Sequence, residues 1–316
     1  MLSRVAENLY WLARYMERAE NTARMIQVNA NLVLDLPGGV TTGWAPLIRI
    51  VEATEAFEAS GRKYGERGVI AFLVGDYDNP CSIVSSIALA RENARTVRDM
   101  IPRELWEHVN DLHLYAREHL KGGLARRERH QHLQYVIEAA QAFTGILEGT
   151  MIRGMGFRFL SAGRYLERAD MTCRIVDVRS SSLLVDKGAE SLKPYENIQW
   201  MSVLKSLTGY QMYRLKKRVR VHSDAVVEFL MLDDEFPRAV YSCLGHLEFQ
   251  LSRLPNNTDP LRVVTRLQRH LQEQPLRDVQ ADTLHAYIVE VLEGLGEVHE
   301  CLAQNYFDPE LATRRA

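Results

Sequence analysis

Residues 14–24 read RYMERAENTAR, and residues 164–174 read RYLERADMTCR. Seven of the eleven positions are identical at a constant offset of 150 residues, and most of the others differ conservatively. Neither segment contains glycine or proline, and the apolar residues around the first follow a helical spacing. An internal repeat of this kind predicts that the chain is built from two copies of one helical unit.

Two further pairs of segments extend the repeat in the same order along the chain. FLVGDYDNP at 72–80 matches FLMLDDEFP at 229–237, and each segment joins Phe-Leu to an acidic turn and a proline. Residues 132–151 match residues 283–302 in their apolar spacing. We therefore expect an all-α, internally duplicated helical bundle with pseudo-two-fold symmetry. Its repeats would be residues 1–153 and 154–316, packed as one domain with a shared core.

Almost every segment of the chain has the apolar spacing of an amphipathic helix. Trp44 and Trp200 are expected near the starts of helices over 44–60 and 196–222, and VIAFLV at 69–74 is read as a short buried helix rather than a strand. The other expected helices span residues 4–34, 80–100, 103–120, 128–152, 157–186, 237–254, 261–273 and 277–305.

The composition excludes several classes of protein. The 316 residues include 39 Lys and Arg against 41 Asp and Glu, a balance that argues against a nucleic-acid binder. No apolar run approaches the roughly 20 residues that span a bilayer. The four cysteines lie far apart without a C-x-x-C pair, as is usual for reduced thiols in the cytoplasm. A cytoplasmic protein without membrane or nucleic-acid contacts is expected.

The repeated motif predicts a cluster of arginines and glutamates. Arg14, Glu17 and Arg24 are spaced i, i+3 and i+10, so they share one helix face, on which Arg14 and Glu17 could pair. Arg18 lies about 100° away on the flank, where it could stack on Trp11 or pair with Glu7. The candidate site residues are therefore Arg14, Glu17, Arg18, Arg24, Arg164, Glu167, Arg168 and Arg174.

These charges are shared by the two copies although their neighbours differ. Asn21 corresponds to Met171, and Trp11 corresponds to Ser161. Exposed ion pairs contribute about 0–1 kcal/mol and are freely exchanged, whereas breaking a buried pair costs about 3–5 kcal/mol. We therefore expect a buried ion-pair network where the two helices meet at the pseudo-axis. A ligand pocket at that axis and plain surface charge are the alternatives.

The acidic residues of the motif could also suggest a metal site. Glu17 with Glu20, and Glu167 with Asp170, form i, i+3 carboxylate pairs. Di-iron bundles require a Glu-x-x-His motif as well, and neither copy has a histidine there. The adjacent arginines compete for the same carboxylates. Neither a metal nor a cofactor is expected.

Two basic runs are candidates for a docking surface. The first contains Arg126, Arg127, Arg129, His130 and His132, and the second contains Arg214, Lys216, Lys217, Arg218 and Arg220. Either could bind an acidic partner or be a solvated helix face. The sequence contains no nucleophile elbow, P-loop or dinucleotide fingerprint. It therefore gives no positive indication of an enzyme, and no catalytic residue is assigned.

Several motifs together resemble the Alpha-E family. They are YWLARYMERAE, ERAENTAR, ERAD, DNPCSIVSSIALARENARTVRD, LWEHVND and FP-RAV. The resemblance covers essentially the whole chain and implies a bacterial all-helical domain whose Glu-Arg motif is Glu17-Arg18 and Glu167-Arg168. Members of that family tend to be encoded beside, or fused to, circularly permuted ATP-grasp ligases, and near transglutaminase-like proteases. The resemblance thus implies a role in making or modifying a small peptide or amide.

The function expected from these features is a non-catalytic accessory or scaffold subunit of an ATP-grasp peptide-ligase system. Its partner would be the ligase, together with a small peptide that is being extended. The alternative is an enzyme or a small-molecule or peptide binder that uses the Arg/Glu cluster at the pseudo-two-fold axis, where arginines can bind carboxylates through two hydrogen bonds. The sequence leaves homo-oligomerisation open.

Overall fold

The computed structural model describes residues 1–35, 43–184, 196–273 and 281–307, and in these ranges it contains helices and no β-strand. The expectation of an all-α chain is therefore confirmed. Within the same ranges, no helix combines the length and hydropathy that crossing a membrane requires.

The first part of the chain consists of three long helices with shorter ones between them. The long helices are α1 (Ser3–Asp35), α6 (Arg103–Glu118) and α8 (Arg126–Thr150). The shorter elements are α2 (Ala45–Ile50), α3 (Thr54–Ala59), α4 (Glu66–Gly75), α5 (Ile83–Thr96), the 3-10 turn Arg98–Met100 and α7 (Leu120–Leu124).

The second part begins with the long helix α9 (Met155–Leu184). It continues with α10 (Glu196–Ser206), α11 (Tyr210–Lys217), α12 (Ser223–Leu232), α13 (Val240–Leu251), α14 (Thr258–Glu273) and α15 (Ala281–Leu302), and the described chain ends in a π-helical turn at Ala303–Phe307.

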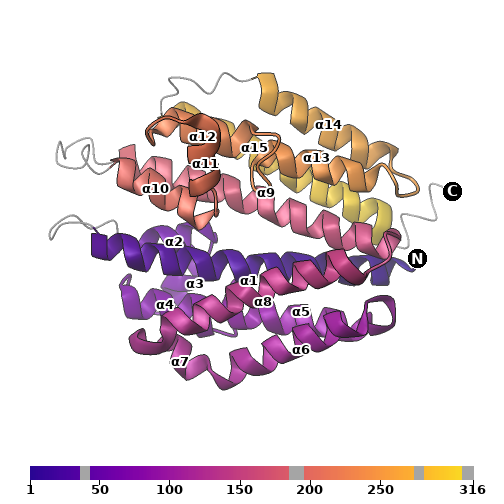
Figure 1. Cartoon of the computed structure of the whole chain (residues 1–316), viewed down its shortest axis with the longest axis horizontal. Helices are drawn as coiled ribbons and strands as arrows, with labels where there is room; N and C mark the ends of the chain where they lie inside the picture. Colours follow the sequence, from indigo (N-terminus) through magenta and orange to yellow (C-terminus); the bar gives the residue numbers. More distant parts are fainter. Residues whose placement is uncertain (36–42, 185–195, 274–280, 308–316) are drawn as a thin grey trace.

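Helices α1 and α9 pack against each other in the middle of the molecule (Figure 1). Helix α1 also packs on α5 and α8, whereas α9 packs on α13 and α15. Contacts between the two central helices progress in the same direction along both helices, from Tyr10 beside Gly163 to Asn29, which is hydrogen-bonded to Arg179. The two helices are therefore parallel, and the motif residues lie between them.

The two central helices bury most of their middle turns, which stabilises helices of this length. Helix α1 places apolar or small residues against its neighbours at helical spacing, and these are Leu9, Leu12, Met16, Ala19, Ala23 and Ile26. Gly163 permits α9 to approach α1 closely, because a Cβ at this position would lie 2.1 Å from the Tyr10 carbonyl oxygen. Small residues at such a crossing bring the two backbones, and hence the motif side chains, within reach of each other.

Two expected helices are interrupted in the structure. The stretch 44–60 is divided into α2 and α3 at Glu52, whose φ is 51°. The stretch 196–222 is divided at Thr208 and ends early at Arg218, whose φ values are 58° and 54°. A residue in the left-handed region cannot continue an α-helix. The expected residues 185–186 and 277–280 lie outside the described ranges, while VIAFLV lies in the buried helix α4 as expected.

Candidate functional site

Each of the two central helices supplies a glutamate that is bound by an arginine of the other helix. Arg168 donates from Nε and Nη2 to the two carboxylate oxygens of Glu17, at 2.9 and 2.8 Å. Arg18 donates in the same way to Glu167, at 2.6 and 3.0 Å. Both glutamates are therefore held in bidentate ion pairs, which are among the strongest polar contacts in proteins.

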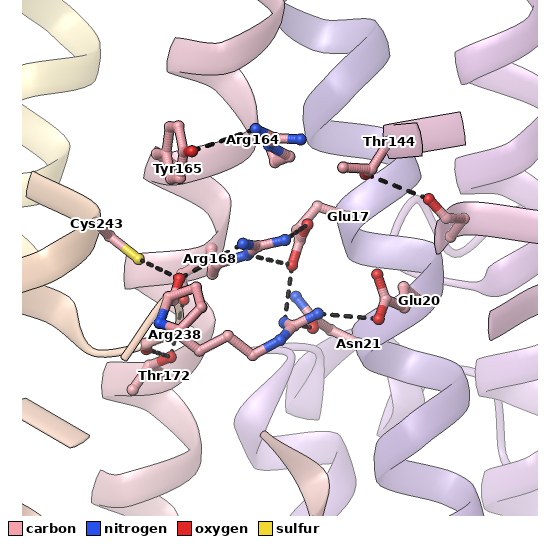
Figure 2. A network of polar contacts seen from close by, with 12 residues as sticks. Glu17, Glu20, Asn21, Thr144, Arg164, Tyr165, Arg168, Thr172, Arg238 and Cys243 are labelled. Atoms are coloured by element: carbon pink, nitrogen blue, oxygen red, sulfur yellow. Dashed lines mark hydrogen bonds and ion pairs between the residues drawn. The ribbon is translucent and has the colours of Figure 1, made fainter. Parts of the chain in front are cut away.

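A third side chain completes the shell around each glutamate. Arg14 Nε donates to Glu167 Oε2 at 2.6 Å, and Arg238 Nη1 donates to Glu17 Oε1 at 2.8 Å. Figure 2 shows Arg168 and Arg238 both directed at Glu17. Arg238 also donates to Asn21 Oδ1 at 2.7 Å and to a further carboxylate, that of Glu20, at 2.9 Å. This side chain thus ties the start of α13 to α1.

The remaining motif arginines bind carboxylates at the edge of this network. Arg24 pairs with Glu20 along α1 at 2.8 Å, and Arg174 pairs with Asp170 along α9 at 2.6 Å. Arg174 also contacts Glu52. Arg164, in contrast, donates to Glu148 Oε1 at 2.9 Å and to the Tyr165 hydroxyl at 3.3 Å. The structure therefore places all eight predicted residues in ion pairs.

The partners within the motif differ from those expected along a single helix. Arg14 pairs with Glu167 of the opposite helix rather than with Glu17, because the packing of α1 on α9 brings the Glu167 carboxylate to 2.6 Å from its Nε. The guanidinium of Arg14, not that of Arg18, lies over the Trp11 ring, 4.9 Å from its centroid. Arg18 lies over Tyr15 at 5.6 Å. The interhelical contact thus replaced both of the intrahelical contacts that the spacing suggested.

Burial and the arginines act in opposite directions on the two central glutamates. The side chains of Glu17 and Glu167 are each only 2% exposed. Burial alone would raise the pKa of Glu17, but Arg168 and Arg238 more than offset it and lower the pKa to about 2. In the same way, Arg18 and Arg14 overcome burial and lower the pKa of Glu167 to about 2. Both carboxylates are therefore ionised at neutral pH.

This arrangement limits the chemistry that the motif can perform. An acid with a pKa near 2 is a poor proton donor or acceptor at pH 7, since general acid–base catalysis favours a pKa near the working pH. Each of the two glutamates already accepts three arginine hydrogen bonds. Among the described residues, no group of three or more histidine, cysteine, aspartate or glutamate side chains is placed to hold a metal ion. The geometry is that of an interhelical clasp.

Sequence reasoning did not identify Arg238 or Tyr10 as parts of the network. Arg238 follows Pro237 in the FP-RAV segment, one of the motifs that resemble the Alpha-E family. The Tyr10 hydroxyl receives a hydrogen bond from Arg14 at 3.2 Å and contacts His299 Nδ1 at 2.9 Å. Burial raises the pKa of Tyr10 to about 12. The position of Arg238 directly after Pro237 could have indicated a special role for it. No sequence pattern, in contrast, connects Tyr10 with His299, which lies 289 residues away.

The two basic runs lie apart from the central clasp. Arg126, Arg129 and His130 line a cavity of about 190 Å³ near the start of α8. Arg214, Arg218 and Arg220 line an open groove of about 670 Å³ between α10, α11 and the segment that follows. Lys216 pairs with Asp233 at 2.7 Å, and Lys217 pairs with Glu228 at 3.3 Å. In the second run, the residues that pair locally differ from those that line the groove, whereas in the first run Arg129 both pairs with Glu66 and lines the cavity.

The chain is similar to longer mycobacterial proteins. They are an uncharacterized protein of Mycobacterium bovis and two from Mycobacterium tuberculosis strains CDC 1551 and H37Rv. Each is 25% identical over 324 residues, which covers 92% of this chain and 35% of the relative. The chain thus spans about a third of the length of the curated relatives it matches. No solved structure matches it.

A family model matches residues 1–307. The family is described as a predicted alpha-helical domain with a conserved ER motif, and its name is Alpha-E. Both parts of that description fit the geometry above, because the described chain is helical and two Glu-Arg dipeptides, Glu17-Arg18 and Glu167-Arg168, join its central helices. The chain therefore belongs to the Alpha-E family.

Proposed function

We propose that this protein is a non-catalytic accessory or scaffold subunit that works in the cytoplasm with an ATP-grasp peptide ligase. The observation that carries the proposal is the closed state of the motif: its two buried glutamates are ionised and fully paired with arginines. Such a clasp stabilises a fixed helical body. It offers neither a free acid nor a free base to a substrate.

The lengths of the mycobacterial relatives support a role alongside other protein segments. The matching region makes up 35% of each relative, so in those proteins the helical unit is part of a chain about three times as long. A helical unit that forms part of a longer chain in its relatives is well suited to work beside other protein segments. The ATP-grasp partner itself is inferred from the family resemblance.

The groove beside α11 is the surface best suited to such docking. Its arginines Arg214, Arg218 and Arg220 form no ion pair with any carboxylate in the described ranges. Exposed apolar side chains adjoin them, with Leu215 at 67% and Val219 at 50% exposure. A basic surface that also carries exposed apolar groups favours a protein partner with acidic and apolar residues.

We also propose that the two repeats, residues 1–153 and 154–316, arose by duplication and are related by a pseudo-two-fold axis. The helix bounds support this relationship. Helix α4 begins at Glu66 and α12 at Ser223, and α5 begins at Ile83 and α13 at Val240, which is 157 positions later in each case (223 − 66 and 240 − 83). The crossed glutamate–arginine pairs are reciprocal, as such an axis requires.

The alternative function is a small-molecule or peptide binder, or an enzyme, that uses the Arg/Glu cluster at this axis. That function would need arginine N–H groups that are free to donate hydrogen bonds to a ligand carboxylate. Arg14, Arg18 and Arg168 instead donate to the buried glutamates, although Nε and Nη1 of Arg164 and Nη2 of Arg24 are buried without a hydrogen-bond partner. The paired geometry therefore favours the accessory role.

Co-elution tests the proposal directly. The protein is mixed at micromolar concentration with an ATP-grasp ligase encoded beside it, and complex formation and ligase activity are measured. The triple variant Arg214→Glu, Arg218→Glu and Arg220→Glu should abolish co-elution. A control with the same change of charge, Arg98→Glu, Arg103→Glu and Arg262→Glu, should retain it, because these exposed arginines lie outside the groove. Separate elution of the unmodified proteins with unchanged ligase activity would refute the accessory role.

A further inference from the structure

We propose that the cavity at the start of α8 binds a small organic carboxylate with an apolar tail. The cavity has a volume of about 190 Å³ and lies between the C-terminal part of α1, Trp44 and the first turns of α4 and α8. This site is separate from both the central clasp and the α11 groove, and it does not depend on the proposed docking function.

The polar side of the cavity is basic and incompletely paired. Arg129 is 7% exposed, and its Nη1 donates to Glu66 Oε1 at 2.7 Å. Its Nε is buried without a hydrogen-bond partner. Arg126 is 75% exposed at its side chain and lies 3.7 Å from the same Glu66 oxygen, beyond a good hydrogen bond. Glu66 thus neutralises one of two adjacent guanidiniums, and the surplus positive charge suits an anion.

The backbone at this point also favours an anion. The cavity adjoins the N-terminus of the 25-residue helix α8, where no side chain caps the helix and the residue before it is Ala125. The N-terminal end of a helix carries a partial positive charge. His130 lies in the same turn, and its Nδ1 contacts the Gln27 amide nitrogen at 3.1 Å. The arginines and the helix terminus therefore both favour an anion in this cavity.

The cavity lining also contains apolar side chains, which select against a bare inorganic anion. They are Ala30, Val33, Leu34, Leu133 and the buried Trp44, and the polar Gln27 and Asn31 lie among them. An engineered cavity of about 150 Å³ binds benzene, so a cavity of this size suits a ligand of similar or slightly greater size. A carboxylate head at the arginines and a short apolar tail against Leu133 and Trp44 would match both kinds of lining group.

The two repeats differ at this cavity. When 132–151 is aligned with 283–302, Arg129 corresponds to Gln280 and His130 corresponds to Ala281. Arg126 corresponds to Arg277, so the second repeat keeps one of the three basic residues. Arg129 and His130 are specific to the first repeat, as expected if they serve a site with a separate role.

Calorimetric titration of the purified protein with isovalerate and benzoate tests the proposal. The neutral amides isovaleramide and benzamide, and inorganic phosphate, are titrated in parallel. We expect saturable one-to-one binding of at least one carboxylate, with at least tenfold weaker binding of its amide and of phosphate. Arg126→Met should weaken carboxylate binding about tenfold without unfolding the protein, because this side chain is mostly exposed. Arg127→Met is the matched control, since Arg127 is exposed and does not line the cavity.

Four outcomes would overturn the assignment. They are the absence of saturable carboxylate binding up to millimolar concentration, equal affinity for acid and amide, tighter binding of phosphate, and equal weakening by Arg126→Met and Arg127→Met. Arg129→Met provides a second readout through its melting temperature. Benzoate should raise the melting temperature of the unmodified protein but not that of this variant. None of these measurements involves the ligase, so failure here is distinguishable from failure of the docking function.

Discussion

Gly163 of α9 lies directly against the backbone of Tyr10 in α1: a Cβ built on Gly163 would be 2.1 Å from the Tyr10 carbonyl oxygen and 3.0 Å from its carbonyl carbon. These are backbone atoms, so the clash cannot be relieved by a side-chain rotation. The close approach sets the distance between the two central helices. That distance in turn decides whether Glu17 can reach Arg168 and Glu167 can reach Arg18.

The first prediction is that Gly163→Ala destabilises the protein by about 1–3 kcal/mol or more, the cost of overpacking a rigid contact. In a protein of this size, each kcal/mol corresponds to roughly 2–4 °C of melting temperature. Gly145→Ala is the control, because nothing lies within 4 Å of a Cβ there and α8 is helical around it. It should be neutral or stabilising. Equal melting temperatures for the two variants would show that the crossing is not tightly constrained.

The second prediction concerns the glutamate of the second motif. Glu167→Gln leaves Arg14 and Arg18 without their shared anion in a buried setting, so we expect a loss of about 3–5 kcal/mol in the free energy of unfolding. Glu107→Gln should cost less than about 1 kcal/mol, because its pair with Arg103 is exposed. Urea titration of both variants measures the difference. A cost for Glu167→Gln as small as the control would contradict a structural clasp.

The third prediction is energetic coupling between Arg238 and Glu20. Their side chains are 7% and 4% exposed and are joined at 2.9 Å. A double-mutant cycle with Arg238→Met and Glu20→Gln should give a coupling energy of about 0.5–3 kcal/mol, the range for residues in one buried network. The pair Arg262 and Asp259, which is exposed, should give a value near the lower limit of detection. Purely additive effects for Arg238 and Glu20 would rule out the bridge between α13 and α1.

The fourth prediction is a loss of stability at acid pH that depends on Glu17 and Glu167. Their pKa values are lowered from 4.5 to about 2 in the folded protein. A group with a depressed folded pKa stabilises the protein above its unfolded pKa, and this contribution is lost as the pH falls. Each glutamate should therefore contribute on the order of 3 kcal/mol at neutral pH, lost progressively between about pH 4.5 and pH 2. Melting curves over this range check the slope.

A variant separates this effect from general acid denaturation. Glu17→Gln should flatten the dependence of the melting temperature on pH below about 4.5, because it removes one of the two titrating groups while leaving exposed carboxylates unchanged. The slope for Glu107→Gln should match that of the unmodified protein. If Glu17→Gln also leaves the slope unchanged, the carboxylate does not carry the acid sensitivity.

The spacing of apolar residues was sufficient to predict that the chain is helical, and the internal repeat was sufficient to identify the Glu-Arg motif. The unbroken apolar spacing of residues 4–34 predicted α1 to within a residue of its observed bounds. It did not predict the interruption at Glu52, where no glycine or proline stands, and it passed over the one at Thr208 although Gly209 follows directly. Burial of α4 was likewise readable from its run of apolar residues.

The sequence by itself determined which residues carry the charges and which lie one turn apart. The pairs of Arg24 with Glu20 and of Arg174 with Asp170 have the i, i+4 spacing of neighbours on one helix, whereas Arg14 and Glu17, spaced i, i+3, bind Glu167 and Arg168 of the other helix. Only the tertiary structure decided that Glu17 binds Arg168 and Arg238, because those partners are 151 and 221 residues away. Ion pairing requires contact within about 4 Å, and the packing of α1 against α9 at Gly163 is what brings these side chains to that distance.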